Sequence, residues 1–153
     1  RDFCLSRGLG DVYKRQVEHL PRNISPASII GLPEDRIQGI TLKNIDIESP
    51  GGGNPFYAKC GLTAKELEGI PEMRTAYPEF SQFKELPAWG IFIRHADDIR
   101  LDNVKLKVHS FDYRPAIVTS DVKGVMLERV DIQPTPNDKR EQFFMYQTFN
   151  VTK

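Results

Sequence analysis

The chain has 153 residues, with 21 Lys and Arg against 21 Asp and Glu, so its formal net charge is zero. This balance argues against a nucleic-acid-binding protein, and the lack of a basic amphipathic stretch argues against a membrane-surface protein. No apolar run approaches the roughly 18 residues that a membrane span requires. Eleven Gly and eleven Pro indicate many turns and few long helices.

The N-terminal segment differs in character from the rest. Residues 5–16 resemble a peptide translated from sequencing-adapter read-through, so we expect residues 1–16 to be non-native or disordered; an ordinary polar arm is the alternative. Residues 17–153 are then expected to be the C-terminal part of a single domain, with no recognisable secretory signal. Cys4 and Cys60 have neither metal-binding nor redox spacing, which argues against a disulfide framework.

A motif recurs at residues 36–49, 95–108 and 121–134. Within each copy the apolar residues fall at i, i+2, i+5 and i+7, which predicts two short strands separated by a bend rather than a helix. The aligned apolar columns are Ile40/Ile99/Val125, Leu42/Leu101/Leu127, Ile45/Val104/Val130 and Ile47/Leu106/Ile132. The bend carries Asn44, Asn103 and Arg129. The two asparagines are interpreted either as simple turn residues or as a hydrogen-bonded pair, which Arg129 would interrupt.

A further strand is predicted before each copy. Residues 89–95 align with 115–121 at an offset of 26, residues 142–148 continue the series one residue later, and residues 28–31 precede the first copy. A unit of this length is too short for the helical crossover of an α/β fold. It suits one turn of a solenoid in which each strand stacks on its equivalent. We therefore predict an all-β protein built as a parallel β-helix.

A long loop insertion interrupts the repeat at about residues 48–88, because the offset rises to 59 between Ile40 and Ile99. Gly51–Gly53 are interpreted as a turn, since the Lys-Ser/Thr of a phosphate-binding loop does not follow. A short helix is expected at residues 63–69, with Thr63 as its N-cap and Gly69 as its end. Four aromatic side chains nearby either stack on sugars or pack the loop onto the coil: Tyr77, Phe80, Phe83 and Trp89.

These segments together resemble glycoside hydrolase family 28, the polygalacturonase and rhamnogalacturonan-hydrolase group. The resemblance lies in residues 28–33, 37–47, 49–53, 77–80, 86–90 and 112–116. It implies the C-terminal coils of a right-handed, pectin-lyase-like β-helix from a secreted or periplasmic parent enzyme. It also implies that the parent is monomeric and inverts a galacturonan linkage of pectic polysaccharide without a cofactor, using paired aspartates.

The family's catalytic motifs (Asn-Thr-Asp, Asp-Asp, Gly-His-Gly and Arg-Ile-Lys) are not intact here. Asp97-Asp98 and residues 36–38 come nearest, but both are predicted to lie in connecting turns, and no histidine has glycine on both sides. We therefore expect no catalytic, cofactor-binding or metal-binding residue in this chain. Acidic residues with the spacing of a Ca²⁺ site are also missing, which argues against a polysaccharide lyase, the third alternative.

Four residues are candidates for substrate binding: Arg94 and His95 at the end of one predicted strand, and Tyr113 and Arg114 in the segment that leads into the next coil. Arginine suits recognition of a galacturonate carboxylate. The alternative is that these residues simply form the charged exterior of a coil. The predicted function is a catalytically inactive fragment of a pectin-degrading hydrolase, and a β-solenoid module for carbohydrate binding or adhesion is the second possibility.

Overall fold

The computed structural model describes residues 25–53, 62–75, 83 and 85–153. Strands dominate this part of the chain, and a single short helix accompanies them, which confirms the all-β prediction. The elements are β1 (Ala27–Ile30), β2 (Ile37–Gln38), β3 (Thr41–Ser49), α3 (Ala64–Glu68), β4 (Ile91–Val108), β5 (Ile117–Gln133) and β6 (Phe143–Thr152). The prediction of a disulfide-free chain concerns Cys4 and Cys60, which lie outside the described residues.

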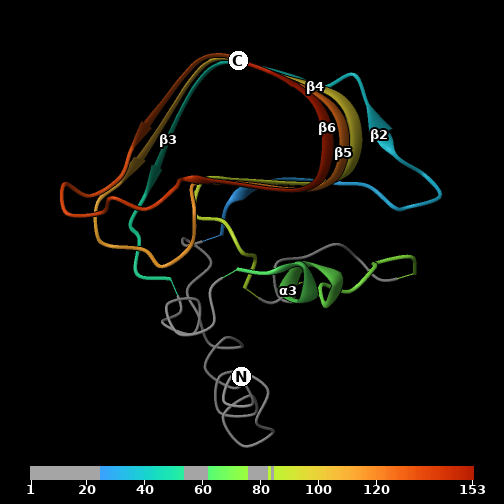
Figure 1. The fold of residues 1–153 in the computed structure, drawn as a ribbon, viewed down its shortest axis with the longest axis horizontal. Helices are drawn as coiled ribbons and strands as arrows, with labels where there is room; N and C mark the ends of the chain where they lie inside the picture. Colours follow the sequence, from blue (N-terminus) through green and yellow to red (C-terminus); the bar gives the residue numbers. More distant parts are fainter. Residues whose placement is uncertain (1–24, 54–61, 76–82, 84) are drawn as a thin grey trace, which may run out of the picture.

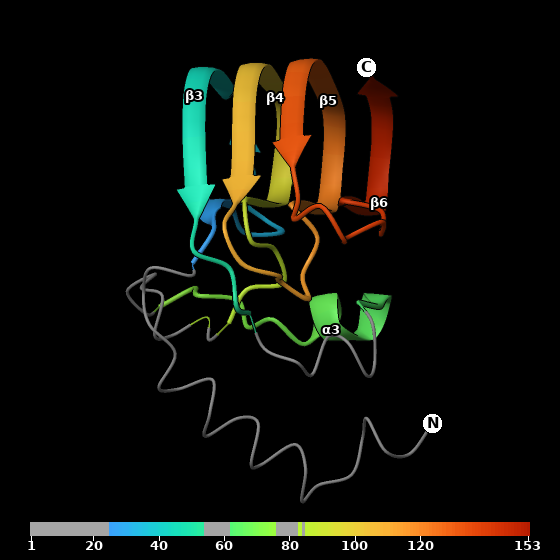
Figure 2. The ribbon, with the colours of Figure 1, turned by 90° about the vertical axis from the view of Figure 1, so that its left-hand side faces the viewer.

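All strand pairings are parallel and join the strands into one sheet. The long strand β4 pairs with β5, and β5 pairs with β6, so that the strands form a row (Figure 2). On its other side β4 pairs with β1, β2 and β3 along successive parts of its length. The three shorter strands together are therefore the equivalent of one long strand.

The register of these pairs follows the predicted repeat. Ile91 is level with Ile117, and Ile117 is level with Phe143, so the offset is 26 residues at both steps. The predicted shift of one residue at 142–148 is therefore wrong. The predicted strand at residues 28–31 is confirmed, because Ala27 pairs with Ile91. The predicted alignment of the apolar columns is also confirmed, because Leu42 pairs with Leu101 and Leu101 pairs with Leu127.

The strands bend at the same levels in every layer, so β4, β5 and β6 follow one path around a common interior (Figure 1). Each bend is marked by residues with positive φ, a conformation that Gly, Asn and Asp adopt most readily. The bends comprise His95/Asp121/Gln147, Gly39/Asp98/Gly124/Asn150 and Asn44/Asn103/Arg129. The third of these was predicted from sequence, and the second coincides with the connecting turn predicted at Asp97-Asp98. The first was not predicted.

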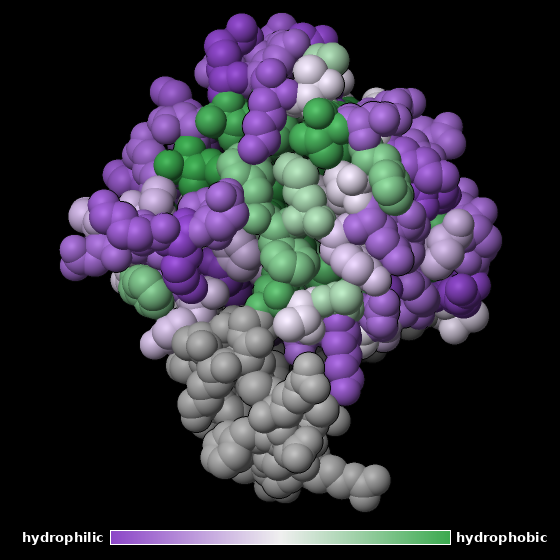
Figure 3. Space-filling model, in the orientation of Figure 1, coloured by the Kyte–Doolittle hydropathy of each residue, from purple (hydrophilic) through white to green (hydrophobic). Residues whose placement is uncertain are grey.

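The interior is filled by the apolar columns. Leu101, Val104 and Leu106 of β4 have no exposed surface, and Trp89 lies in the same core. Figure 3 views the molecule along the row of strands, and hydrophobic side chains gather at the centre of that end face. The apolar interior therefore extends to the end of the row.

A second apolar cluster lies outside the sheet and is covered by the insertion. Phe92 and Val118 are level with Phe144 on this outer face, and Leu67 of α3 packs against them. The predicted helix is confirmed: Thr63 is its N-cap, its backbone N–H donates to Glu66 at 2.9 Å, and Gly69 is its C-cap. Burial of Leu67 explains why so short a helix persists, since five residues are not stable alone.

The two asparagines of the third bend are hydrogen-bonded to each other. The Asn103 amide donates to the side-chain oxygen of Asn44 at 2.8 Å, so the turn interpretation by itself is incomplete. Arg129 occupies the next layer and pairs instead with Asp102.

We predict that Asn103→Ala lowers the free energy of unfolding by about 1–2 kcal/mol, because it removes this bond and strains the left-handed backbone. Asn103→Gly should cost less, since glycine accepts the backbone conformation. Urea denaturation of both variants measures the difference. An Ala variant as stable as the wild type would contradict both contributions.

Candidate functional site

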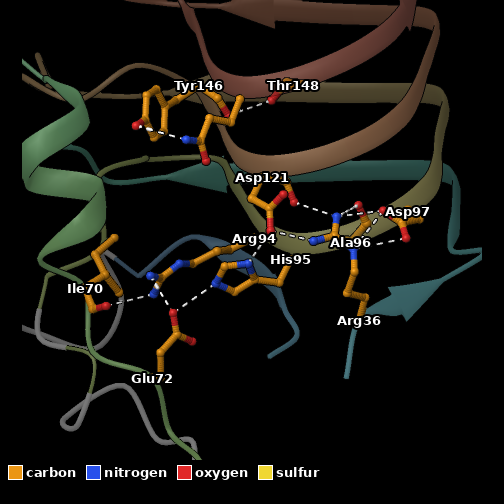
Figure 4. A network of polar contacts seen from close by, with 11 residues as sticks. Arg36, Ile70, Glu72, Arg94, His95, Ala96, Asp97, Asp121, Tyr146 and Thr148 are labelled. Atoms are coloured by element: carbon orange, nitrogen blue, oxygen red, sulfur yellow. Dashed lines mark hydrogen bonds and ion pairs between the residues drawn. The ribbon is translucent and has the colours of Figure 1, made fainter. Parts of the chain in front are cut away.

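A cluster of charged side chains lies at the first bend of the strands (Figure 4). It draws on four segments of the chain, namely the stretch before β2, the insertion after α3, and the strands β4 and β5. Its members are Arg36, Glu72, Arg94, His95, Asp97 and Asp121.

His95 stands at the centre of this cluster and is only 8% exposed. Its Nδ1 lies 2.7 Å from Asp121 Oδ2, and its Nε2 lies 2.9 Å from Glu72 Oε1. A ring protonated on both nitrogens donates to both carboxylates, whereas a neutral ring donates to one. The positive φ of His95, at 49°, sets this orientation at the bend.

Arg36 joins two layers of the sheet through its guanidinium group. Its Nε lies 3.0 Å from both carboxylate oxygens of Asp97, and its Nη2 donates to Asp97 Oδ1 at 2.7 Å. Its Nη1 donates to the Asp121 carboxylate, and its Nη2 also donates to the Asp121 carbonyl at 2.9 Å. The hydrogen bond from Arg36 holds the pKa of Asp97 below its usual range. Such multidentate, charge-assisted contacts fix geometry strongly.

Arg94 fastens the insertion to the sheet. Its Nη2 lies 2.7 Å from Glu72 Oε1, and its Nη1 donates to the Ile70 carbonyl at 2.8 Å. Burial lowers the pKa of Arg94, against the opposing effects of the Glu72 and Asp121 charges. Both Arg94 and His95 therefore bind the same carboxylate, that of Glu72, from adjacent positions.

A second ion-pair group is buried beneath the loops that follow the strands. The Arg114 guanidinium is fully buried, and its Nε and Nη2 donate to Asp112 at 2.9 and 2.8 Å. Glu85 lies 3.8 Å from the same guanidinium. Asp112 also accepts from the Gly53 backbone N–H at 2.9 Å, so the group connects three loops.

The predicted substrate-binding residues are thus mainly internal. Arg94, His95 and Arg114 are 5%, 8% and 0% exposed, so the alternative of a charged exterior is wrong for these three. Each of the three side chains binds at least one carboxylate of the chain itself, although the buried Nε of Arg94 has no hydrogen-bond partner among the described residues. Tyr113 is half-buried and lies edge-on to Phe111. Direct contact of these residues with a substrate remains a prediction.

The two near-matches to catalytic motifs contact each other instead of facing an open site. Arg36 pairs with Asp97, while Asp98 occupies a bend with a φ of 54°. The segments predicted as connecting turns form strand pairs as well, since Gln38 pairs with Asp97. Among the described residues, no group of three or more His, Cys, Asp or Glu side chains is arranged to hold a metal ion.

The aromatic residues of the insertion divide into two sets. Phe83 and Trp89 are buried, and Trp89 Nε1 lies 3.2 Å from Gln142 Oε1, so both pack the chain rather than face solvent. Tyr77 and Phe80 lie outside the described residues. Sequence reasoning missed the exposed Phe111 and its neighbour Arg140, which belong to two different loops. No periodic pattern marks them.

A shallow apolar cavity lies at the outer edge of the sheet. It has a volume of about 380 Å³. Residues that pack into the interior and residues that pack into the outer apolar cluster both line it. The residues that line it are Ser28, Ile29, Ile30, Ile37, Ile40 and Phe83. Within the described part of the chain, the edge formed by β1 and β2 therefore leaves part of the apolar interior uncovered.

The charged cluster predicts how stability depends on pH. Burial raises the pKa of Asp121, but hydrogen bonds from His95 and Arg36 outweigh it and hold that pKa below its ordinary value of 3.8. A carboxyl group with a lowered folded-state pKa stabilises the fold above its unfolded pKa, and this stabilisation disappears as the pH falls through the folded value.

Asp121→Asn should therefore destabilise the protein at about pH 6, and this effect should be smaller at about pH 3, below the ordinary pKa of 3.8. Asparagine tolerates the positive φ of 54° at this position, so the charge is the main change. Urea denaturation at both pH values measures the difference. A difference that stays constant with pH would show that the Asp121 charge does not stabilise the fold.

Comparisons with protein-family models, curated proteins and solved structures give no match for this chain. In the part of the chain that the structure describes, no helix is long and apolar enough to cross a membrane.

Proposed function

We propose that this chain forms the C-terminal coils of a right-handed parallel β-helix in a pectin-degrading glycoside hydrolase related to family 28. In this proposal the chain supports the solenoid, and the catalytic aspartates lie on coils upstream. The resemblance to that family supports the choice of hydrolase and of galacturonan as substrate, and it lies in residues 28–33, 37–47, 49–53, 77–80, 86–90 and 112–116.

The constant register is the observation that carries the architectural part of the proposal. Equivalent residues of β4, β5 and β6 are stacked on one another at an offset of 26 residues, and the positive-φ bends recur at the same levels. A chain that returns to the same position after every 26 residues, with its strands parallel, is expected of a solenoid. The described residues leave the apolar edge beside Ile29, Ile37 and Ile40 uncovered, which supports a further coil stacking there.

The charge arrangement supports a structural rather than a catalytic role. Inverting glycosidases need two carboxyl groups roughly 6.5–9.5 Å apart with water between them. Asp97, Asp121 and Asp112 are each bound to an arginine instead, and Glu72 is bound to Arg94 and His95. Carboxylates held in this way are poor candidates for a general acid.

The experiment compares the parent protein with this chain. The reading frame upstream of the parent gene is expected to encode Asn-Thr-Asp, Asp-Asp and Gly-His-Gly. The intact parent should release reducing sugar from polygalacturonate, and the 153-residue chain should release none. An upstream frame without these motifs would remove the hydrolase from the proposal, and turnover by the chain itself would place the active site within it.

A further inference from the structure

An exposed aromatic group lies where the loops leave the strands. The segments after β3, β4 and β5 run along the same side of the row of strands (Figures 1 and 2). The second of these loops contains Phe111 and Tyr113, and the third contains Arg140. The first loop approaches the second through Gly52, whose N–H donates to the Phe111 carbonyl at 3.1 Å.

The geometry of the group is well defined. Phe111 is 41% exposed, and its ring centroid lies 5.0 Å from that of Tyr113, with the rings at 83°. The Arg140 guanidinium carbon lies 4.7 Å from the Phe111 centroid. A Cβ added to Gly52 would meet no heavy atom of the described residues within 4 Å, so these residues leave the surface beside the Phe111 backbone open.

Arg140 is held in place by its own loop and the preceding one. Its Nε and Nη2 donate to the Asp138 carboxylate at 2.7 and 2.6 Å, and its Nη1 donates to the Tyr113 carbonyl at 2.9 Å. Its Nη2 also donates to the Asp112 carbonyl. These contacts use four of the five guanidinium N–H groups, which leaves one on Nη1 for a ligand. The hydrogen bonds that Arg140 donates to the Asp138 carboxylate raise the pKa of Arg140.

We propose that Phe111, Tyr113 and Arg140 form a binding platform for a pyranose ring. The Arg140 guanidinium covers one face of the Phe111 ring, so the apolar C–H face of a sugar would stack on the aromatic surface that remains exposed. A hydroxyl oxygen of the sugar would accept a hydrogen bond from the remaining N–H of Arg140. Because these side chains are already positioned, little conformational entropy is lost on binding. The choice of a pectic galacturonan as the sugar rests on the proposed function.

The charges at the platform decide which part of the sugar is recognised. Asp138 neutralises Arg140 through two hydrogen bonds, so the platform has no uncompensated cation for a galacturonate carboxylate. Recognition should therefore depend on the ring face and hydroxyl groups rather than on an ion pair. Binding is expected to be similar for methyl-esterified and free galacturonan and to change little with salt, since salt screens ionic contacts.

The test is affinity electrophoresis of the full 153-residue chain in gels containing either polygalacturonate or methyl-esterified pectin. Phe111→Ala should weaken retention by about fivefold or more, because the stacking surface is lost. Phe111→Trp should preserve retention. Phe149→Ala is the matched control, since Phe149 is 58% exposed on β6 and should leave retention unchanged.

Three results would overturn the platform: no retention of the wild type, equal retention of the wild type and Phe111→Ala, or retention of free galacturonan alone that salt abolishes. Thermal melting of each variant separates lost binding from lost folding. Retention does not depend on hydrolysis. A parent without catalytic motifs would therefore refute the proposed hydrolase while leaving the platform intact, and a failed retention assay would leave the hydrolase proposal standing.

Discussion

Leu101→Asp is expected to abolish cooperative folding of the chain. Leu101 has no exposed surface and lies between Leu42 and Leu127 in the central column. Losing its burial costs about 1.5–3 kcal/mol. An unpaired carboxylate in the same place adds several kcal/mol of desolvation, or forces protonation. Since domains of this size are stable by roughly 5–15 kcal/mol, the sum removes most or all of the stability.

Met126→Asp is the matched control for this prediction. Met126 is 39% exposed on β5, one residue from Leu127, and it is level with Arg100. The same change of an apolar residue to aspartate should therefore cost less than about 1 kcal/mol. Circular dichroism during urea denaturation measures both variants. A Leu101→Asp protein with an unchanged, cooperative transition would refute the buried column.

Arg114→Met is expected to cost about 3–5 kcal/mol, because it leaves charge buried without its partner. Asp112 and Glu85 are 2% and 7% exposed, and both carboxylates face the Arg114 guanidinium. Asp112 also anchors the Gly53 backbone, so the loops that meet here should loosen together. Urea denaturation measures the loss, and amide hydrogen exchange at residues 51–53 reports the loosening.

Arg100→Met provides the comparison for an exposed pair. Arg100 donates to Glu128 at 2.8 Å, but their side chains are 46% and 39% exposed. Solvent and salt screen exposed pairs of this kind, so Arg100→Met should cost far less stability than Arg114→Met. Equal costs for the two substitutions would show that burial of the Arg114 group does not determine its contribution.

The repeat could be predicted from the sequence because it depends on the periodic spacing of apolar residues. Apolar residues two apart predict strands, and their recurrence after 26 residues predicts which strands are level with one another. The cap and end of the short helix were readable for a similar reason, since Thr63 and Gly69 are local signals. Asn44 and Asn103 indicated one bend, because asparagine tolerates the left-handed conformation.

The charged clusters could not be read in the same way, because their partners are distant in sequence. Arg36 meets Asp121 across 85 residues, and His95 meets Glu72 across 23. The same limitation explains why Phe111 and Arg140 were not recognised as neighbours.

The sequence by itself predicted the strands, the apolar columns and the register of β4 with β5, because hydrophobic burial leaves a periodic signature along the chain. The register of β6 was predicted one residue off. Only the tertiary structure shows that Arg94, His95 and Arg114 are buried, whereas the sequence allowed them to form a charged exterior. Their burial depends on carboxylates brought close by the folding of separate loops, and Coulombic pairing of that kind has no period in the sequence.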